Sequence, residues 1–207
     1  MRIGRSDRQS GVRLALVGAG VAFAAILLSS VTPRAATIAA PGRPPLPYAD
    51  GAPPGFSGGF KEQACDACHF EAKPNTPPGQ VTLTGVPERY APGQQYPLAI
   101  ALSRPGLALG GFQLAARFAD GTQAGSFERG AGEEKRIGVE TQGNVQYVNQ
   151  KRPGAELTAT DTAKWTVVWT APASGAVTFD VAANAADKDE SARGDYVYTA
   201  TVQTRPQ

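Results

Sequence analysis

The chain is poor in the side chains from which enzymes build their active sites. Its 207 residues include one histidine, two cysteines and one methionine. A Ser-His-Asp triad would need the single histidine, His69, and no Gly-x-Ser-x-Gly turn is present. The glycine-rich fingerprints of phosphate and dinucleotide sites are also missing. The sequence therefore speaks against an enzyme that works through its own side chains.

The chain also lacks an excess of basic residues. Its formal net charge of +2 comes from 20 basic and 18 acidic residues, and residues 1–36 hold five of the basic and one of the acidic ones. The remainder carries no basic stripe, so we do not expect nucleic acid as a partner. Four acidic residues gather near the C-terminus, and their spacing does not match an EF-hand loop, so they predict a solvated loop. They are Asp187, Asp189, Glu190 and Asp195.

Residues 1–36 predict a signal peptide or an N-terminal anchor. Four arginines up to Arg13 precede an apolar run from Leu14 to Leu28, the order of a charged n-region and an h-region. The run is shorter than the roughly 20 apolar residues of a membrane span. A cut after Ala39 fits the small-residue rule best; without a cut, this segment would be the protein's membrane contact. Either way we expect an extracytoplasmic protein, periplasmic or secreted.

Both cysteines and the histidine lie together in the run Cys65-Asp66-Ala67-Cys68-His69. Random placement would give this spacing about once in twenty thousand arrangements, so the spacing calls for a chemical reason. A Cys-x-x-Cys-His run is the attachment site of c-type haem, in which two thiols bind the porphyrin and the imidazole ligates the iron. We therefore predict one covalent haem c, with Cys65 and Cys68 as attachment points and His69 as the proximal iron ligand.

Three other interpretations of the motif stay open. Cys65 and Cys68 can form a small disulfide loop in an oxidising compartment, with His69 as a bystander. A thioredoxin-like redox pair should follow a strand and cap a helix, and nothing before Cys65 predicts that strand. A closed zinc site needs four ligands, and the chain has three Cys and His residues in all.

The N-terminal half of the chain divides by composition. Residues 37–60 are rich in proline and glycine, which predicts an extended linker without regular structure. Residues 61–79 hold the Cys-x-x-Cys-His run and have room for one or two helical turns, too little for a complete cytochrome c fold. A haem attached here would therefore have to pack against the domain that follows.

Residues 80–204 predict an all-β domain. Short runs of β-branched and aromatic residues alternate with turn residues, and long amphipathic helical patterns are missing. We predict an immunoglobulin-like antiparallel β-sandwich of seven or eight strands. The expected strands are 81–84, 96–102, 112–118, 165–170, 177–181 and 196–203, with weaker ones at 137–140 and 145–148. The expected core residues are Trp165, Trp169, Phe112, Leu114, Phe118, Phe179, Val181, Val197 and Val202.

Short segments spread over this domain occur in a family-specific combination. They are Val81-Thr-Leu-Thr-Gly-Val-Pro87, Tyr90-Ala-Pro-Gly93, Gly111-Phe-Gln-Leu114, Ala124-Gly-Ser-Phe127, Trp165 to Pro172, Val177-Thr-Phe179, Ala183-Asn184-Ala185 and Gly194-Asp-Tyr-Val-Tyr198. Together they resemble the bacterial Reeler-like domain of choice-of-anchor V proteins, over about residues 60–204. The resemblance implies a secreted β-sandwich, and several bacterial members carry a Cys-x-x-Cys-His run before the first strand. Related sequences can have a histidine after Tyr147, where this chain has Val148-Asn149-Gln150, so an obvious distal ligand is missing.

The ligand count limits the function of a haem at this motif. His69 supplies one axial position, and the only methionine is Met1, so the sixth position is left empty, to water, or to an unusual donor such as Lys61, Lys73 or a tyrosine. Such an iron binds small ligands or passes single electrons. We expect an exported mono-haem protein for electron transfer or haem-ligand binding, with a redox protein as partner. The alternative is an extracytoplasmic structural or adhesive β-sandwich with a Cys65–Cys68 disulfide and no haem.

Overall fold

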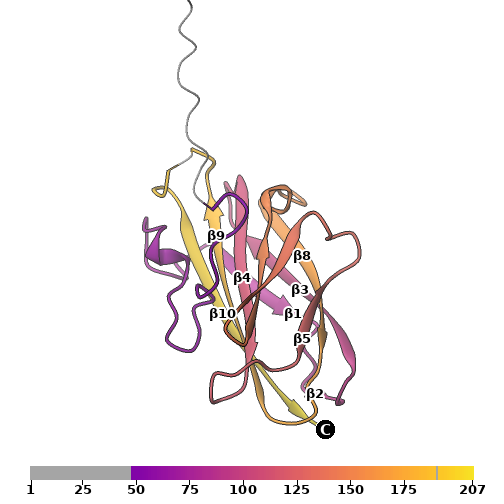
Figure 1. The fold of residues 1–207 in the computed structure, drawn as a ribbon. Coiled ribbons are helices and arrows are strands. Elements are labelled where there is room, and N and C mark those ends of the chain that lie inside the picture. Colours follow the sequence, from indigo (N-terminus) through magenta and orange to yellow (C-terminus); the bar gives the residue numbers. More distant parts are fainter. Residues whose placement is uncertain (1–47, 190) are drawn as a thin grey trace, which may run out of the picture. The chain divides into compact units, whose positions relative to one another are not determined.

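The computed structural model describes residues 48–189 and 191–207, which fold into two β-sheets packed as a sandwich (Figure 1). All strand pairs are antiparallel except β10 with β2. The predicted all-β sandwich is therefore confirmed. The four-stranded sheet has the order β1 (Gln80–Thr84), β3 (Gln95–Ser103), β8 (Thr162–Thr170), β5 (Ser126–Arg129). The six-stranded sheet has the order β2 (Arg89–Tyr90), β10 (Tyr196–Pro206), β9 (Val177–Ala186), β4 (Leu109–Arg117), β7 (Val145–Gln150), β6 (Ile137–Gln142).

Eight of these ten strands overlap a range that the sequence predicts. The other two, β2 and β5, have two and four residues, too few to display a period of two. Two short 3₁₀ turns complete the described elements: η1 at Cys65–Ala67 and η2 at Arg152–Ala155.

The space between the sheets is filled by aromatic and aliphatic side chains. Trp165 and Trp169, four residues apart on β8, both point into it, and each indole N–H donates to a backbone carbonyl. Most of the expected core is confirmed as fully buried: Trp165, Trp169, Phe112, Leu114, Phe179 and Val181. Phe118 and Val202 are only partly buried at the rim of the core. Val197 is buried, but on the opposite face of its sheet.

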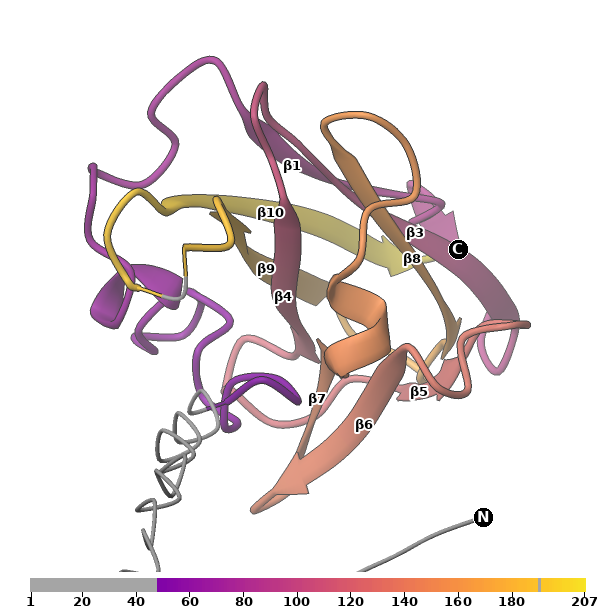
Figure 2. The ribbon, with the colours of Figure 1, turned by 90° about the horizontal axis from the view of Figure 1, so that it is seen from above.

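That opposite face of the six-stranded sheet is covered by residues 51–76, which we call the strap. The strap lies beside β10, β9 and β4 (Figure 2). It holds one element, η1, and otherwise has no helix or strand. The described part of the predicted linker thus has no regular structure, yet its residues 52–60 are held against the sandwich by hydrogen bonds and close contacts.

The predicted export segment, residues 1–36, lies outside the described residues. Within the described ones, no helix has the length and apolar character to span a membrane.

Candidate functional site

The Cys-x-x-Cys pair lies on the η1 turn of the strap. The carbonyl of Cys65 accepts hydrogen bonds from the backbone N–H of Cys68 and of His69, at 3.1 and 2.9 Å. These two bonds close the turn and bring both cysteines and the histidine into one compact loop. In the described chain no strand precedes η1, so the strand–helix context of a thioredoxin-like pair is missing there.

The two cysteines differ in their surroundings, although both are free thiols. Cys65 is partly buried against Ala64, Ala182 and Val197, a small apolar cluster under η1. Burial, with a smaller contribution from the charge of Asp66, raises the pKa of the Cys65 thiol to about 12. Cys68 is exposed. Cys65 is therefore a protonated thiol facing the sheet, and Cys68 faces solvent.

The His69 ring is held by Asp195 at one end of the six-stranded sheet, with the Asn184 amide beside it. Its Nδ1 lies 2.5 Å from Oδ2 of Asp195 and 3.2 Å from Nδ2 of Asn184. An ionised carboxylate only accepts hydrogen bonds, so we assign the ring proton to Nδ1. The other nitrogen, Nε2, makes no hydrogen bond within the described chain, and the side chain is 32% exposed. Nε2 is thus the nitrogen that remains open to a metal.

Asp195 is 2% exposed, in contrast to the solvated loop that the sequence predicts. It directly precedes β10 and receives three contacts. Besides His69, Nδ2 of Asn184 lies 3.2 Å from its Oδ2, and the N–H of Asp187 donates to its Oδ1 at 3.3 Å. Asp187 and Asp189 are exposed, as expected, and Glu190 lies outside the described residues. The prediction was wrong for Asp195, because the strap covers it with His69.

A second polar cluster anchors the strap beside β4. Glu62 pairs with Arg117 through its Oε1, which also accepts the hydroxyl of Tyr147 at 2.5 Å. Its Oε2 accepts the hydroxyl of Ser57 at 2.7 Å. Arg117 and Tyr147 are almost fully buried, and desolvation together with the bond to Glu62 raises the pKa of Tyr147 to about 12. The cluster ties the strap, three residues before Cys65, to β4 and β7.

Buried amides hold the start of the strap. Gln113 on β4 donates to the carbonyl of Pro53 at 2.9 Å and accepts the N–H of Phe56, while Asn149 on β7 donates to the carbonyl of Ala52 at 3.1 Å. Gln113 and Asn149 are fully buried. Backbone groups that would otherwise lose their hydrogen bonds on burial are satisfied in this way.

Close approach also fixes the middle of the strap. A Cβ on Gly59 would overlap the carboxylate of Asp180 on β9. Any larger residue at position 59 would force the strap or the Asp180 side chain to shift.

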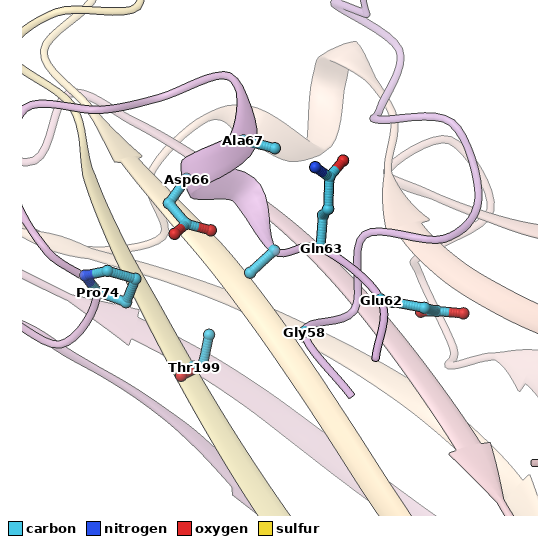
Figure 3. A pocket seen from close by; sticks show the side chains of 8 residues that line it. Gly58, Glu62, Gln63, Asp66, Ala67, Pro74 and Thr199 are labelled. Carbon is cyan, nitrogen blue, oxygen red and sulfur yellow. The ribbon is translucent and has the colours of Figure 1, made fainter. Parts of the chain in front are cut away.

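The described surface has a shallow hollow of about 390 Å³ beside η1, with Asp66 and Ala67 on one side and Thr199 of β10 on the other (Figure 3). Its lining includes Asp66 and Ala67, the two middle residues of the Cys-x-x-Cys run, but not Cys65, Cys68 or His69. The lining residues are Gly58, Glu62, Gln63, Ala64, Asp66, Ala67, Pro74 and Thr199.

The structure brings together the three predicted site residues and adds partners that the sequence does not reveal. Asp195 and Asn184 contact His69 from positions more than 110 residues away, and no local pattern signals such a contact. Lys61 and Lys73 are exposed, as expected of surface lysines. The described residues contain no cluster of three or more His, Cys, Asp or Glu side chains that could hold a metal ion.

No family model matches the chain, and no curated protein is similar to it. Among solved structures, the chain is similar to the human F-spondin reeler domain, with 18% identity over 65% of this chain and 92% of that chain and a TM-score of 0.43. The Reelin-N domain of F-spondin gives 18% identity, 69% and 95% coverage and a TM-score of 0.45. A cohesin module of a Clostridium perfringens family 33 glycoside hydrolase gives 7% identity, 62% and 96% coverage and a TM-score of 0.45. At this level the likeness concerns the fold alone.

Proposed function

We propose that this protein is an extracytoplasmic β-sandwich module whose strap carries one c-type haem. Cys65 and Cys68 would be the covalent attachment points, and His69 the proximal iron ligand. The observation that carries the proposal is the state of His69. It directly follows the Cys-x-x-Cys pair, its Nδ1 is engaged by a buried carboxylate, and its Nε2 has no partner among the described residues.

The two thiols differ in how accessible they are to a haem vinyl group. Cys68 is exposed, so a porphyrin vinyl group can reach its sulfur directly. Cys65 packs against Ala182 and Val197, but it is only partly buried. Attachment at Cys65 would require its sulfur to turn away from Ala182 and Val197. The donor set of the motif therefore fits two thioether bonds and one axial ligand.

When bound, haem supplies a one-electron couple and an iron position for small ligands. The chain offers no second histidine and no methionine besides Met1. Lys61 and Lys73 extend into solvent. We therefore propose that the sixth position stays accessible to water or to an added small ligand, and that the partner is a protein that exchanges single electrons.

A second candidate function is a haem-free structural or adhesive module. The observation that favours it is the packing of Cys65 onto the sheet in a short turn that also holds Cys68. Oxidation of this thiol pair in an oxidising compartment would give a disulfide-closed loop. The sandwich would then act through its surface, with His69 serving to pin the loop.

The test is a denaturing mass spectrum of the protein exported by a host with c-type haem maturation. A mass gain of one haem, absent from a Cys65→Ala, Cys68→Ala variant, would support the haem protein. A haem-free mass that is two hydrogens light would support the disulfide-closed module, and either haem-free mass would overturn the haem proposal. The same export experiment checks the location, because protein retained in the cytoplasm would contradict an extracytoplasmic module.

A further inference from the structure

Asp195 is a buried carboxylate whose surroundings suit one task. Its three contacts come from the ring of His69, the amide of Asn184 and the backbone N–H of Asp187. Within the described chain, no lysine or arginine forms an ion pair with it. A carboxylate that is 2% exposed is costly to keep ionised unless hydrogen-bond donors surround it.

The end of the β9–β10 hairpin presents this carboxylate to His69. Asn184 belongs to β9 and Asp195 directly precedes β10, and the two strands pair over nine residues. The strap, from a much earlier part of the sequence, brings His69 to the same end of the hairpin. Contacts of Glu62, before His69, and of Asn75, after it, hold the strap in place. Asn75 accepts the N–H of Thr199 on β10 at 2.8 Å. The contact between His69 and Asp195 therefore follows from tertiary structure and not from the motif itself.

We propose that Asp195 is a positioning residue that fixes the tautomer of the His69 ring, and through it the redox potential of the iron. This inference rests on the proposed haem. A carboxylate that accepts the Nδ1 proton fixes the tautomer with Nε2 unprotonated and makes the imidazole a more basic ligand. A more basic imidazole favours ferric over ferrous iron, so the midpoint potential is lowered.

Asp195→Asn tests this with little change of volume. The amide at position 195 can offer its N–H to Nδ1, which transfers the ring proton to Nε2 in the haem-free protein. On the haem protein the loss of the charge is expected to raise the midpoint potential by about 59 mV or more, the equivalent of a tenfold change in relative affinity for a one-electron couple. Asp187→Asn is the matched control, because it removes one negative charge from the same loop, where Asp187 contacts Asp195 only through its backbone N–H.

Two measurements separate this inference from the proposed function. The first is the midpoint potential of the haem proteins. A rise in Asp195→Asn alone supports a positioning role. An unchanged potential, or equal rises in both variants, overturns that role while leaving the attached haem in place.

The second measurement is made on haem-free protein, the Cys65→Ala, Cys68→Ala variant with and without Asp195→Asn. The ring ¹⁵N shifts of its one histidine report the tautomer without ambiguity. An Nδ1–H ring that is lost on Asp195→Asn supports the contact even if the wild-type protein carries no haem and the proposed function fails. A ring protonated mainly on Nε2 in the parent variant overturns the inference.

Discussion

The two faces of the six-stranded sheet are built from the same strands but hold their neighbours by different chemistry. On the inner face, Phe112 and Leu114 of β4 and Phe179 of β9 pack against the tryptophans of β8. On the outer face, Gln113, Arg117, Asp180, Asn184 and Asp195 meet the strap. Seven of the nine buried polar residues of the described chain lie in this second interface: those five with Asn149 and Ser57.

The difference teaches how much each interface depends on single residues. Apolar packing is non-directional, so the core gains from every side chain of about the right size. A buried polar group is satisfied only by one partner at one place. The strap is therefore expected to be the more easily released layer, and the sandwich the part that stays folded when the strap lifts.

The largest expected effect comes from the core. Trp165→Ala removes a fully buried indole and is expected to lower the free energy of unfolding by about 3–5 kcal/mol. Denaturant unfolding measures this loss. Lys164→Ala, on the same strand with its side chain in solvent, is the control and should change stability by less than about 0.5 kcal/mol. Equal losses in the two variants would contradict the core assignment.

A smaller effect is expected at the anchor of the strap. Glu62→Gln leaves the buried guanidinium of Arg117 without its charge partner and is expected to weaken strap docking by about 2 kcal/mol. Protease cleavage between residues 51 and 76 should accelerate, while hydrogen exchange in β3 and β8 stays slow. Glu134→Gln, at an exposed glutamate, should leave both unchanged. Faster exchange throughout the sandwich would show that the two layers unfold together.

The close approach at Gly59 gives a sharper comparison. Gly59→Ala is expected to cost about 1 kcal/mol or slightly more, because the new methyl group overlaps Asp180 and the strap must shift. A double-mutant cycle with Asp180→Ala, followed by strap proteolysis, tests the contact. The cost of Gly59→Ala should shrink when Asp180 is already alanine. An unchanged cost would place the strap elsewhere on the sheet.

The smallest effect leaves stability untouched and concerns the two thiols. The raised pKa of about 12 keeps Cys65 protonated in the folded, haem-free and reduced protein until the pH approaches that value, and only the thiolate alkylates. At pH 8, Cys68 should therefore react with iodoacetamide at least about tenfold faster than Cys65. Peptide mass spectrometry after short labelling measures the ratio, and denatured protein, in which the two rates converge, is the control. Equal rates in the folded protein would contradict the packing of Cys65 on the sheet.

The sequence predicts the inner interface much better than the outer one. The alternation of Trp165, Val167 and Trp169 along β8 is a local signal of a buried face, and it predicts both the sandwich and most of its core. The short strands β2 and β5 are not predicted because they have too few residues to show alternation. The sequence also predicts Val197 of β10 in the core; it is buried, but beneath the strap.

The motif itself could be predicted, and its setting could not. Cys65, Cys68 and His69 are recognisable because their spacing matches the attachment motif of c-type haem. The sequence neighbours of Asp195 and Glu62 form no recognisable motif. Each residue gains its partner, His69 or Arg117, only when the strap packs on the sheet. For the same reason the proline- and glycine-rich start of the strap predicts only an extended linker and does not reveal that the segment packs on the sheet. Its hydrogen bonds are made by backbone groups, which leave no pattern of side chains to detect.

The order of the strap's anchors has a mechanical consequence. From residue 51 onward the chain meets Gln113 and Asn149, then Arg117, then Asp195, then Thr199, before it enters β1. A pull on the chain at residue 51 would load these anchors one at a time, whereas the long ladders of β9 and β10 would bear load on many hydrogen bonds at once. Under tension the strap would therefore detach from the sheet one anchor at a time, while the sandwich stays folded. The loop with both cysteines would be released only after the Glu62 anchor had opened.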